Sequence, residues 1–125
     1  MGRYMEKVSV VIITFNEEKN IERCLESVRW ADEIVVVDTF STDRTVEICR
    51  RFTDRVFQES WRGYGLQKNL CASKANNRWV LNVDADEVIS PECAEAIRDV
   101  LASELKHPVY RFPRKNFFGN RWIRY

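Results

Sequence analysis

Short apolar runs alternate with amphipathic stretches along this chain. The runs Val8–Ile13 and Glu33–Val37 consist almost entirely of β-branched apolar residues, a pattern typical of strands that are covered on both faces. Three further runs, Arg55–Gln58, Trp79–Val83 and Val109–Phe112, have the length and composition of additional short strands. We therefore expect a sheet whose strands are separated in sequence by other elements.

The stretches between these runs have the apolar spacing of helices. The apolar positions of the four expected helices are Ile21, Leu25 and Val28; Val46 and Ile48–Phe52; Leu66, Leu70 and Ala75; and Ala94, Ile97, Val100 and Leu101. We expect Asn16 to cap the first helix and the polar loop 39–43 to cap the second. Gly63–Gly65 opens the third, and Ser90–Pro91 is a strong start for the fourth. Strands that alternate with helices predict an α/β domain with a mainly parallel sheet.

Size and charge limit the class of protein. The chain has 125 residues, enough for one domain, and a net charge of +1, so it has no general attraction to nucleic acid or acidic membranes. No apolar stretch approaches the roughly 20 residues of a membrane-spanning helix, and residues 1–7 lack the apolar core of a signal peptide. We therefore expect a cytoplasmic location and no nucleic-acid partner.

The cysteines and the single histidine carry no recognisable site. The four cysteines are spread along the chain without a Cys-x-x-Cys pair, at Cys24, Cys49, Cys71 and Cys93. Their neighbours resemble helix interiors, where Cys acts as a small buried apolar residue, so we expect neither a disulfide nor a zinc site. His107 is the only histidine, which gives little support to a histidine-based catalytic dyad or triad.

Carboxylates follow two of the expected strands directly. Asp38 follows the second strand, and Asp84 and Asp86 follow the fourth. Because side chains alternate along an extended chain, Asp84 and Asp86 are expected on the same side, where such a pair can hold Mg²⁺ together with substrate phosphates. Ligands of parallel α/β sheets bind beyond the carboxyl ends of the strands, so these acids and the polar stretch Thr14–Glu17 should converge on one edge. A solvated acidic strand end is the alternative interpretation.

Five segments, in order along the chain, carry a family resemblance. They are Val10–Asn20, Ala31–Asp38, Ser41–Thr45, Gly65–Asn69 and Trp79–Glu87. Together they resemble the family 2 glycosyltransferases of the GT-A fold, and more closely the bacterial lipopolysaccharide-core branch, which the ending 113–124 also resembles. The resemblance implies that residues 1–125 form the nucleotide-sugar-binding part of a GT-A domain, with a mainly parallel sheet flanked by helices and incomplete at the C-terminus.

The resemblance also implies roles for individual residues. The donor-binding residues that it implies are Thr14, Phe15, Asn16, Glu17, Asp38, Lys68 and Asp84. The loop Thr14–Glu17 would meet the base and ribose, and Asp38 would hydrogen-bond the base. Lys68 would lie near the base or the diphosphate, although a solvent-facing helix residue is the plainer interpretation. Asp84 would face the ribose or the metal. Asp86 would be the main contact of a divalent cation, Mg²⁺ or Mn²⁺, that neutralises charge on the departing diphosphate.

The expected partners follow from the same resemblance. It implies a UDP- or ADP-linked sugar as donor and a saccharide or lipid-linked acceptor, with peripheral association at the inner face of the membrane. The tail from Phe112 to Tyr125 alternates aromatic and basic residues. We expect it to pack against a further part of the protein, the acceptor lipid or a second subunit, which would favour a homo-oligomer.

Two departures from the family pattern matter. Relatives usually have Asp-Ser-Gly-Ser after the second strand, whereas this chain has Phe40 at the Gly position. A positive φ is costly for Phe, so we expect a reshaped loop or a narrowed base pocket. Inverting members also need a carboxylate that deprotonates the acceptor. No acid follows Glu104, so we expect that base to lie beyond Tyr125 and the chain to be a fragment.

Three other classes of protein are alternatives to a glycosyltransferase. A receiver domain would need its acidic pair after the first strand and its phosphoacceptor after the third, whereas the acids here follow the second and fourth. A dinucleotide-binding Rossmann domain would need Gly-x-Gly-x-x-Gly after the first strand, which Thr14–Glu18 does not provide. A nucleotide-sugar-binding module without transferase activity is the alternative that stays open.

Overall fold

The computed structural model describes residues 6–102 and the backbone of residues 109–112 and 121–124. The strands are β1 (Val8–Thr14), β2 (Glu33–Asp38), β3 (Val56–Gln58), β4 (Trp79–Asn82), β5 (Val109–Phe112) and β6 (Arg121–Arg124). The helices are α1 (Ile21–Ser27), α2 (Thr45–Cys49), α3 (Tyr64–Ser73) and α4 (Pro91–Ala102). Strands and helices alternate up to α4, as the sequence pattern predicts.

The strands form one mixed sheet in the order β3-β2-β1-β4-β6-β5. The central pairs β1–β2, β1–β4 and β2–β3 are parallel, whereas β6 is antiparallel to both β4 and β5. The register pairs Thr14 with Asp38 at the carboxyl ends of β1 and β2. Two of the polar side chains noted in the sequence are therefore neighbours across the sheet.

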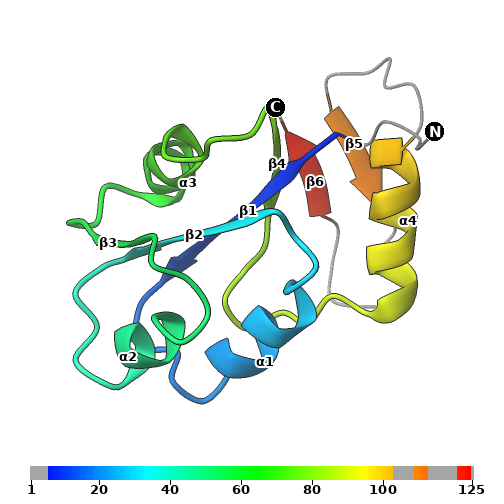
Figure 1. The fold of residues 1–125 in the computed structure, drawn as a ribbon. Coiled ribbons are helices and arrows are strands. Elements are labelled where there is room, and N and C mark those ends of the chain that lie inside the picture. Colours follow the sequence, from blue (N-terminus) through cyan, green and yellow to red (C-terminus); the bar gives the residue numbers. More distant parts are fainter. Residues whose placement is uncertain (1–5, 103–108, 113–120, 125) are drawn as a thin grey trace.

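The two faces of the sheet bury alternate residues against different helices. Helix α3 covers one face, and α1 and α2 lie on the other (Figure 1). On the α3 face, Val11 and Val35 pack with Cys71 in a small core. On the other face, a larger core joins Ile12 and Leu81 to residues of α1, α2 and α4. Burial on both faces explains why the β1 and β2 sequences are almost continuously apolar.

The predicted strands are confirmed within one residue at each end, and β5 has the expected limits. Strand β6 was not predicted. Its residues, Arg121–Arg124, belong to the aromatic and basic tail that we expected to pack outside this sheet, whereas the backbone here lies between β4 and β5. The rest of that tail, residues 113–120 and 125, lies outside the described residues, as does the segment 103–108 that contains the lone histidine.

Two helix predictions are wrong. Asn16 does not cap α1, because the helix begins at Ile21 and Asn16 has a φ of 50° in a separate loop. Leu66 was expected on the buried stripe of α3, yet its side chain is 62% exposed. The buried residues of this helix are Gln67 and Cys71, and the other two predicted positions, Leu70 and Ala75, pack against the same core.

Two other helix features are confirmed. Ser90 caps α4, since its Oγ accepts a hydrogen bond from the backbone N–H of Cys93 at 3.1 Å. All four cysteines are buried and free, one in each of the helices α1 to α4. No helix in the described part of the chain combines the length and apolar character needed to cross a membrane.

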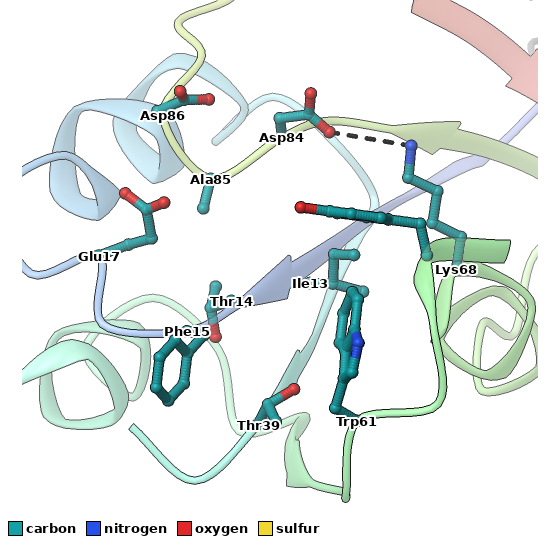
Figure 2. A pocket seen from close by; sticks show the side chains of 11 residues that line it. Ile13, Thr14, Phe15, Glu17, Thr39, Trp61, Lys68, Asp84, Ala85 and Asp86 are labelled. Carbon is teal, nitrogen blue, oxygen red and sulfur yellow. Dashed lines mark ion pairs between the residues drawn. The ribbon is translucent and has the colours of Figure 1, made fainter. Parts of the chain in front are cut away.

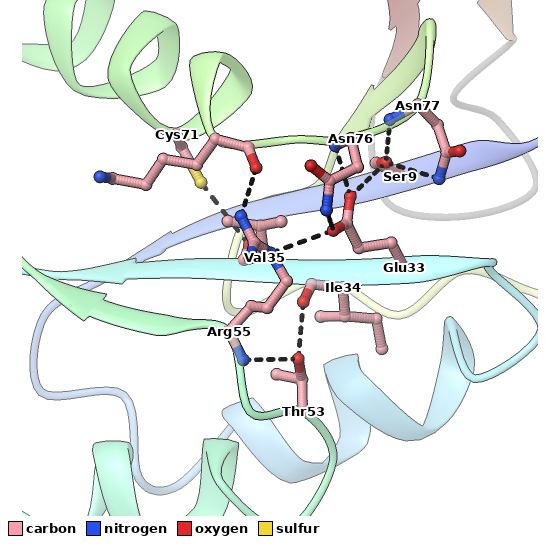
Figure 3. Close-up of polar contacts among 10 residues, drawn as sticks. Ser9, Glu33, Ile34, Val35, Thr53, Arg55, Cys71, Asn76 and Asn77 are labelled. Carbon is pink, nitrogen blue, oxygen red and sulfur yellow. Dashed lines mark hydrogen bonds and ion pairs between the residues drawn. The ribbon is translucent and has the colours of Figure 1, made fainter.

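A polar network ties the amino ends of the strands together (Figure 3). Glu33 at the start of β2 accepts hydrogen bonds from the Ser9 hydroxyl at 2.7 Å and from the backbone and side chain of Asn76 at 2.8 and 2.7 Å. Arg55 forms an ion pair with Glu33 at 3.0 Å and donates to the Lys74 carbonyl at 2.6 Å. These contacts bring β1, β2, β3 and the segment before β4 into register, at the end of the sheet opposite the carboxyl edge.

Candidate functional site

A cavity of about 670 Å³ opens at the carboxyl ends of β1 and β4 (Figure 2). Its walls combine apolar, aromatic and charged side chains, a composition usual for small-molecule sites. The lining residues are Ile13, Thr14, Phe15, Glu17, Thr39, Trp61, Tyr64, Lys68, Asp84, Ala85 and Asp86. The cavity brings together six of the eight residues that the family resemblance singles out. Asn16 and Asp38 are not among those that line it.

The loop after β1 is fastened to the loop after β2. The backbone N–H of Asn16 donates to the Ser41 hydroxyl at 2.7 Å, and the Asn16 side-chain oxygen accepts from the backbone N–H of Thr42 at 2.8 Å. One residue further, the backbone N–H of Glu17 donates to the Thr45 hydroxyl at 2.8 Å. Asn16 therefore joins the two loops, which explains why its side chain faces neither a helix nor the cavity. Phe15 and Glu17 flank this joint and line the cavity on either side of it.

Asp38 lies beneath the cavity with no exposed surface. Its carboxylate accepts hydrogen bonds from the Thr14 hydroxyl at 2.7 Å and from the Ser41 backbone N–H at 2.8 Å. The Ser41 hydroxyl and the Gln58 amide, at 2.5 and 3.4 Å, are two further donors. A buried carboxylate with several donors is compensated for the loss of water. In this arrangement Asp38 fixes the two loops, and contact with a ligand would require one of these bonds to be exchanged.

Phe40 adopts the backbone conformation that the sequence argued against. Its φ is 51°, in the left-handed region where glycine is favoured. The loop is therefore not reshaped to avoid the positive φ. Nor does the Phe40 side chain line the cavity, since the ring is 55% exposed and lies outside the lining set. The expectation of a base pocket narrowed by Phe40 has no support in this structure.

The acidic segment after β4 is a tight turn and not an extended strand end. The backbone N–H of Glu87 donates to the Asp84 carbonyl at 2.9 Å, which closes the turn. The backbone N–H of Asp84 in return donates to the Glu87 carboxylate at 2.8 Å. Alternation along an extended chain is therefore not what places Asp84 and Asp86 at the cavity, but both carboxylates still line it. Glu87 is buried below the turn, with 6% of its surface exposed.

Lys68 faces the acidic turn from α3. Its Nζ lies 4.0 Å from Oδ1 of Asp84, and both side chains are more than 40% exposed. Exposed ion pairs of this length contribute little to stability. The pair therefore matters for the charge of the cavity, where the ammonium group lies beside Asp84 and Asp86 lies further along the same wall (Figure 2).

The oxygen ligands that this turn offers suit a hard divalent cation. Among the described residues no group of three or more His, Cys, Asp or Glu side chains forms a cation cage. Asp84 and Asp86 supply carboxylate oxygens at one wall of the cavity. Mg²⁺ typically uses one or two carboxylates and takes its other ligands from water and substrate phosphates. The two aspartates fit such an ion if a phosphate-bearing ligand occupies the cavity.

A buried thiol contacts the turn from α1. The Sγ of Cys24 donates to the Asp84 carbonyl at 3.5 Å. Burial, together with the nearby Cys49, Asp84, Asp86 and Glu17, raises the pKa of the Cys24 thiol to about 12. Cys24 is therefore a neutral donor that supports the turn, not a reactive thiolate.

Five lining residues are not among the predicted site residues, namely Ile13, Thr39, Trp61, Tyr64 and Ala85. The sequence pattern indicates only a helix-capping loop for Thr39 and a helix start for Tyr64. The available signal is that Trp61 lies in the connection after β3 and Tyr64 is the first residue of α3, so both follow a strand that ends at the carboxyl edge.

Comparison with known proteins identifies the family. The sequence profile of Glycosyl transferase family 2 matches residues 9–125. An uncharacterised glycosyltransferase of Rickettsia typhi is 45% identical over 100 residues, which is 79% of this chain and 34% of the relative. The lipopolysaccharide core biosynthesis glycosyltransferase LpsC of Rhizobium meliloti is 33% identical over 115 residues, covering 88% of this chain and 43% of that protein.

Solved structures show the same fold. The mannosyltransferase PcManGT of Pyrobaculum calidifontis, in complex with GDP-Man and Mn²⁺, has a TM-score of 0.70 and 26% identity over 90% of this chain and 37% of its own. S. aureus TarS 1-349 in complex with UDP-GlcNAc has a TM-score of 0.60 and 31% identity, covering 73% of this chain and 30% of its own.

The chain therefore belongs to glycosyltransferase family 2 and has the GT-A fold. It spans about a third of the length of the Rickettsia relative.

Proposed function

We propose that this chain supplies the donor half of a glycosyltransferase that transfers a sugar from a nucleotide diphosphate to a saccharide or lipid-linked acceptor. The observation that carries the proposal is the cavity at the carboxyl edge, which Lys68, Asp84 and Asp86 line and where Lys68 forms an ion pair with Asp84. Family membership and nucleotide-sugar complexes of similar folds support it. A cation site, an ammonium group and an aromatic surface are the features that a nucleotide diphosphate requires.

The residues divide into those that meet the donor and those that position them. We assign the base and ribose to the loop with Thr14, Phe15 and Glu17, because these side chains line the cavity. Asn16 and Asp38 belong to the same site as positioning residues, since they bond the chain after β1 to the loop after β2. If Asp38 accepted a hydrogen bond directly from the base, that bond would replace one of the donors that it has now.

The charged end of the cavity would receive the diphosphate. Asp86 and Asp84 would hold Mg²⁺ or Mn²⁺, and Lys68 would place its ammonium group beside the phosphates. When bound, such an ion stabilises the negative charge that develops on the departing diphosphate. Lys68 can contribute to the same stabilisation as a fixed positive charge. Both effects act on the leaving group and not on the acceptor.

The proposal also covers the sugar acceptor and the base that deprotonates it. Similarity to LpsC supports lipopolysaccharide or other cell-envelope glycan synthesis. Peripheral association at the inner face of the membrane is a further part of the proposal. In the described residues the carboxylates that line the cavity are Glu17, Asp84 and Asp86. A nucleotide-sugar-binding module without transferase activity is the second candidate, because these acids serve the donor. A binding isotherm and a transfer assay on one preparation distinguish the two.

The test is a thermal-shift titration with nucleotide sugars, with and without Mg²⁺ or Mn²⁺. A ligand at 100 times its Kd should stabilise the wild type by about 2.7 kcal/mol. Asp86→Asn should keep the fold and lose the metal-dependent part of this stabilisation. Asp99→Asn, the same chemical change at an exposed position of α4, is the control and should behave as the wild type. Equal stabilisation of Asp86→Asn, or of the wild type with excess chelator, would refute the proposed cation site.

A further inference from the structure

The donor cavity has two chemically different ends. Lys68, Asp84 and Asp86 gather at one end, and Phe15, Thr39 and Trp61 lie at the other (Figure 2). A nucleoside diphosphate has the same division between a charged part and a flat, weakly polar base. The match fixes its direction in the cavity, with the base at the aromatic end.

At the aromatic end two rings flank Thr39. Phe15 belongs to the loop after β1 and Trp61 to the connection between β3 and α3, and Figure 2 shows them on either side of Thr39. The side chain of Phe15 is 56% exposed and that of Trp61 is 49% exposed. Large aromatic residues with half their surface free lose that exposure when a planar ligand stacks on them.

Trp61 is held in place by its own segment. Its ring packs edge-on against Tyr64, with 4.8 Å between the ring centroids and an angle of 87° between the planes. The segment is anchored by Gln67, which is fully buried. The Gln67 side chain accepts a hydrogen bond from the backbone N–H of Arg62 at 3.1 Å and donates one to the Thr39 hydroxyl at 3.3 Å. The same buried amide thus bonds Thr39 and Arg62, the residue after Trp61, which fixes the segment that carries Trp61 relative to Thr39.

We propose that Trp61 is a donor-binding residue that stacks on the nucleobase of the donor, with Phe15 as the opposite wall. The proposal rests on the proposed donor site and adds the residue that closes it. Base recognition then depends mainly on stacking, because the Asp38 carboxylate beneath is occupied by Thr14 and Ser41. Stacking tolerates different bases, so UDP, ADP and GDP should all use Trp61.

The experiment is calorimetric titration of the chain with UDP, ADP and pyrophosphate in the presence of Mg²⁺. Trp61→Ala should raise the Kd of both nucleotides about tenfold, within the range measured for base–aromatic stacking. Pyrophosphate has no base and should bind the variant and the wild type equally. Trp61→Phe keeps a stacking ring and should stay within about threefold of the wild type. In the wild type UDP should also quench tryptophan emission, and Trp61→Phe should lose most of that quenching.

Leu66→Ala is the matched control, since Leu66 is an exposed apolar residue of α3 outside the cavity lining. Its nucleotide affinities should equal those of the wild type. Unchanged UDP and ADP affinity in Trp61→Ala overturns the stacking proposal, and so does an equal loss for pyrophosphate, which would indicate a general distortion. If the wild type binds none of the three ligands, the proposed donor site itself fails. If Trp61→Ala does not fold, the test is Trp61→Phe, which should lose most of the quenching of tryptophan emission by UDP.

Discussion

At the scale of single residues, the strained backbone lies beside the donor cavity. Within the described residues two side-chain-bearing positions have a positive φ, Asn16 at 50° and Phe40 at 51°. Asn tolerates this region because its short side chain can hydrogen-bond locally, as Asn16 does with Thr42. Phe has no such compensation, and its ring is more than half exposed. Such strain persists where the surrounding structure fixes the backbone, and here the hydrogen bonds between the two loops do so.

We predict that Phe40→Gly stabilises the chain by up to about 1 kcal/mol. Glycine removes a left-handed strain of about 1–2 kcal/mol but increases the entropy of the unfolded chain by an amount worth about 0.4–1 kcal/mol. The exposed ring contributes little burial that could be lost. Urea unfolding of the variant and the wild type measures the difference.

Thr42→Gly provides the comparison for this prediction. Thr42 lies in the same loop and is exposed, but it has no positive φ. The same kind of substitution there should destabilise the chain, because only the entropic term remains. A Phe40→Gly variant that is less stable than the wild type by 1 kcal/mol or more would mean that the ring makes contacts that outweigh the strain.

At the scale of secondary structure elements, the strands were predictable and the details of the loops were not. A strand buried on both faces, such as β1 or β2, has an almost uninterrupted apolar sequence that needs no tertiary information. Strand β6 could not be predicted, because Arg121–Arg124 has two adjacent apolar residues between two charged ones, without the alternation typical of a strand, and it pairs with a sheet edge that only the fold defines. The exposure of Leu66 could not be predicted, because α3 buries a glutamine, Gln67, in preference to that leucine.

The candidate site was likewise predictable only in part. The carboxyl edge and the acids Asp84 and Asp86 follow from strand order and sequence position. The buried state of Asp38 does not, because it depends on donors contributed by Thr14, Ser41 and Gln58 from separate elements. Trp61 has no sequence pattern that marks it, since its position at the cavity depends on the path of the β3–α3 connection. Contacts between residues far apart in the sequence therefore determine the features of the site that local sequence patterns do not predict.

The acidic turn after β4 gives a prediction at this scale. Glu87 does not line the cavity, but its carboxylate accepts the backbone N–H of Asp84. Glu87→Ala removes this acceptor and should lower stability by about 1–3 kcal/mol. Because the turn carries both aspartates, the metal-dependent affinity for UDP should also fall, by about tenfold. Calorimetry at a temperature where both proteins are folded separates the two effects.

Glu87→Gln is the conservative comparison, since its side-chain oxygen can still accept the same hydrogen bond. It should keep most of the UDP affinity that Glu87→Ala loses. If Glu87→Ala loses stability yet binds UDP with magnesium as the wild type does, Glu87 supports the fold without positioning the aspartates. Affinity lost equally in both variants would instead indicate that the negative charge of Glu87 is required.

At the scale of the whole molecule, two polar groups of residues occupy opposite ends of one sheet. The carboxyl edge holds the cavity, with exposed carboxylates and an ion pair that contributes little to stability. The amino edge holds the network around Glu33, whose side chain is 11% exposed and fully engaged. This division implies that function and stability are separable by substitution. Changes at Asp86 should affect ligand binding and not folding, and changes at Glu33 should do the reverse.

The pH dependence of stability should therefore reside partly in Glu33. Burial alone would raise the pKa of this carboxyl group, but hydrogen bonds from Asn76 and Ser9 and the charge of Arg55 hold it below the value of 4.5 usual for Glu. A carboxyl group whose pKa is lower in the folded state contributes stability above its unfolded pKa and loses that contribution as the pH falls through its folded pKa. Glu33→Gln should thus be less stable than the wild type by about 1–3 kcal/mol at pH 7, and the difference should shrink on acidification below about pH 4.5.

Chemical unfolding of both proteins between pH 7 and pH 3 measures this difference directly. Glu22→Gln, at an exposed position of α1 outside the network, is the control and should stay close to the wild type throughout. UDP affinity at pH 7 should be the same in Glu33→Gln and the wild type, because the network lies at the far end of the sheet from the cavity. A stability difference that stays constant from pH 7 to pH 3 would mean that the Glu33 contacts do not depend on its charge. A parallel loss of UDP affinity would mean that the two ends of the sheet are coupled, since the parallel strands β1 and β2 connect Ser9 and Glu33 directly to Thr14 and Asp38.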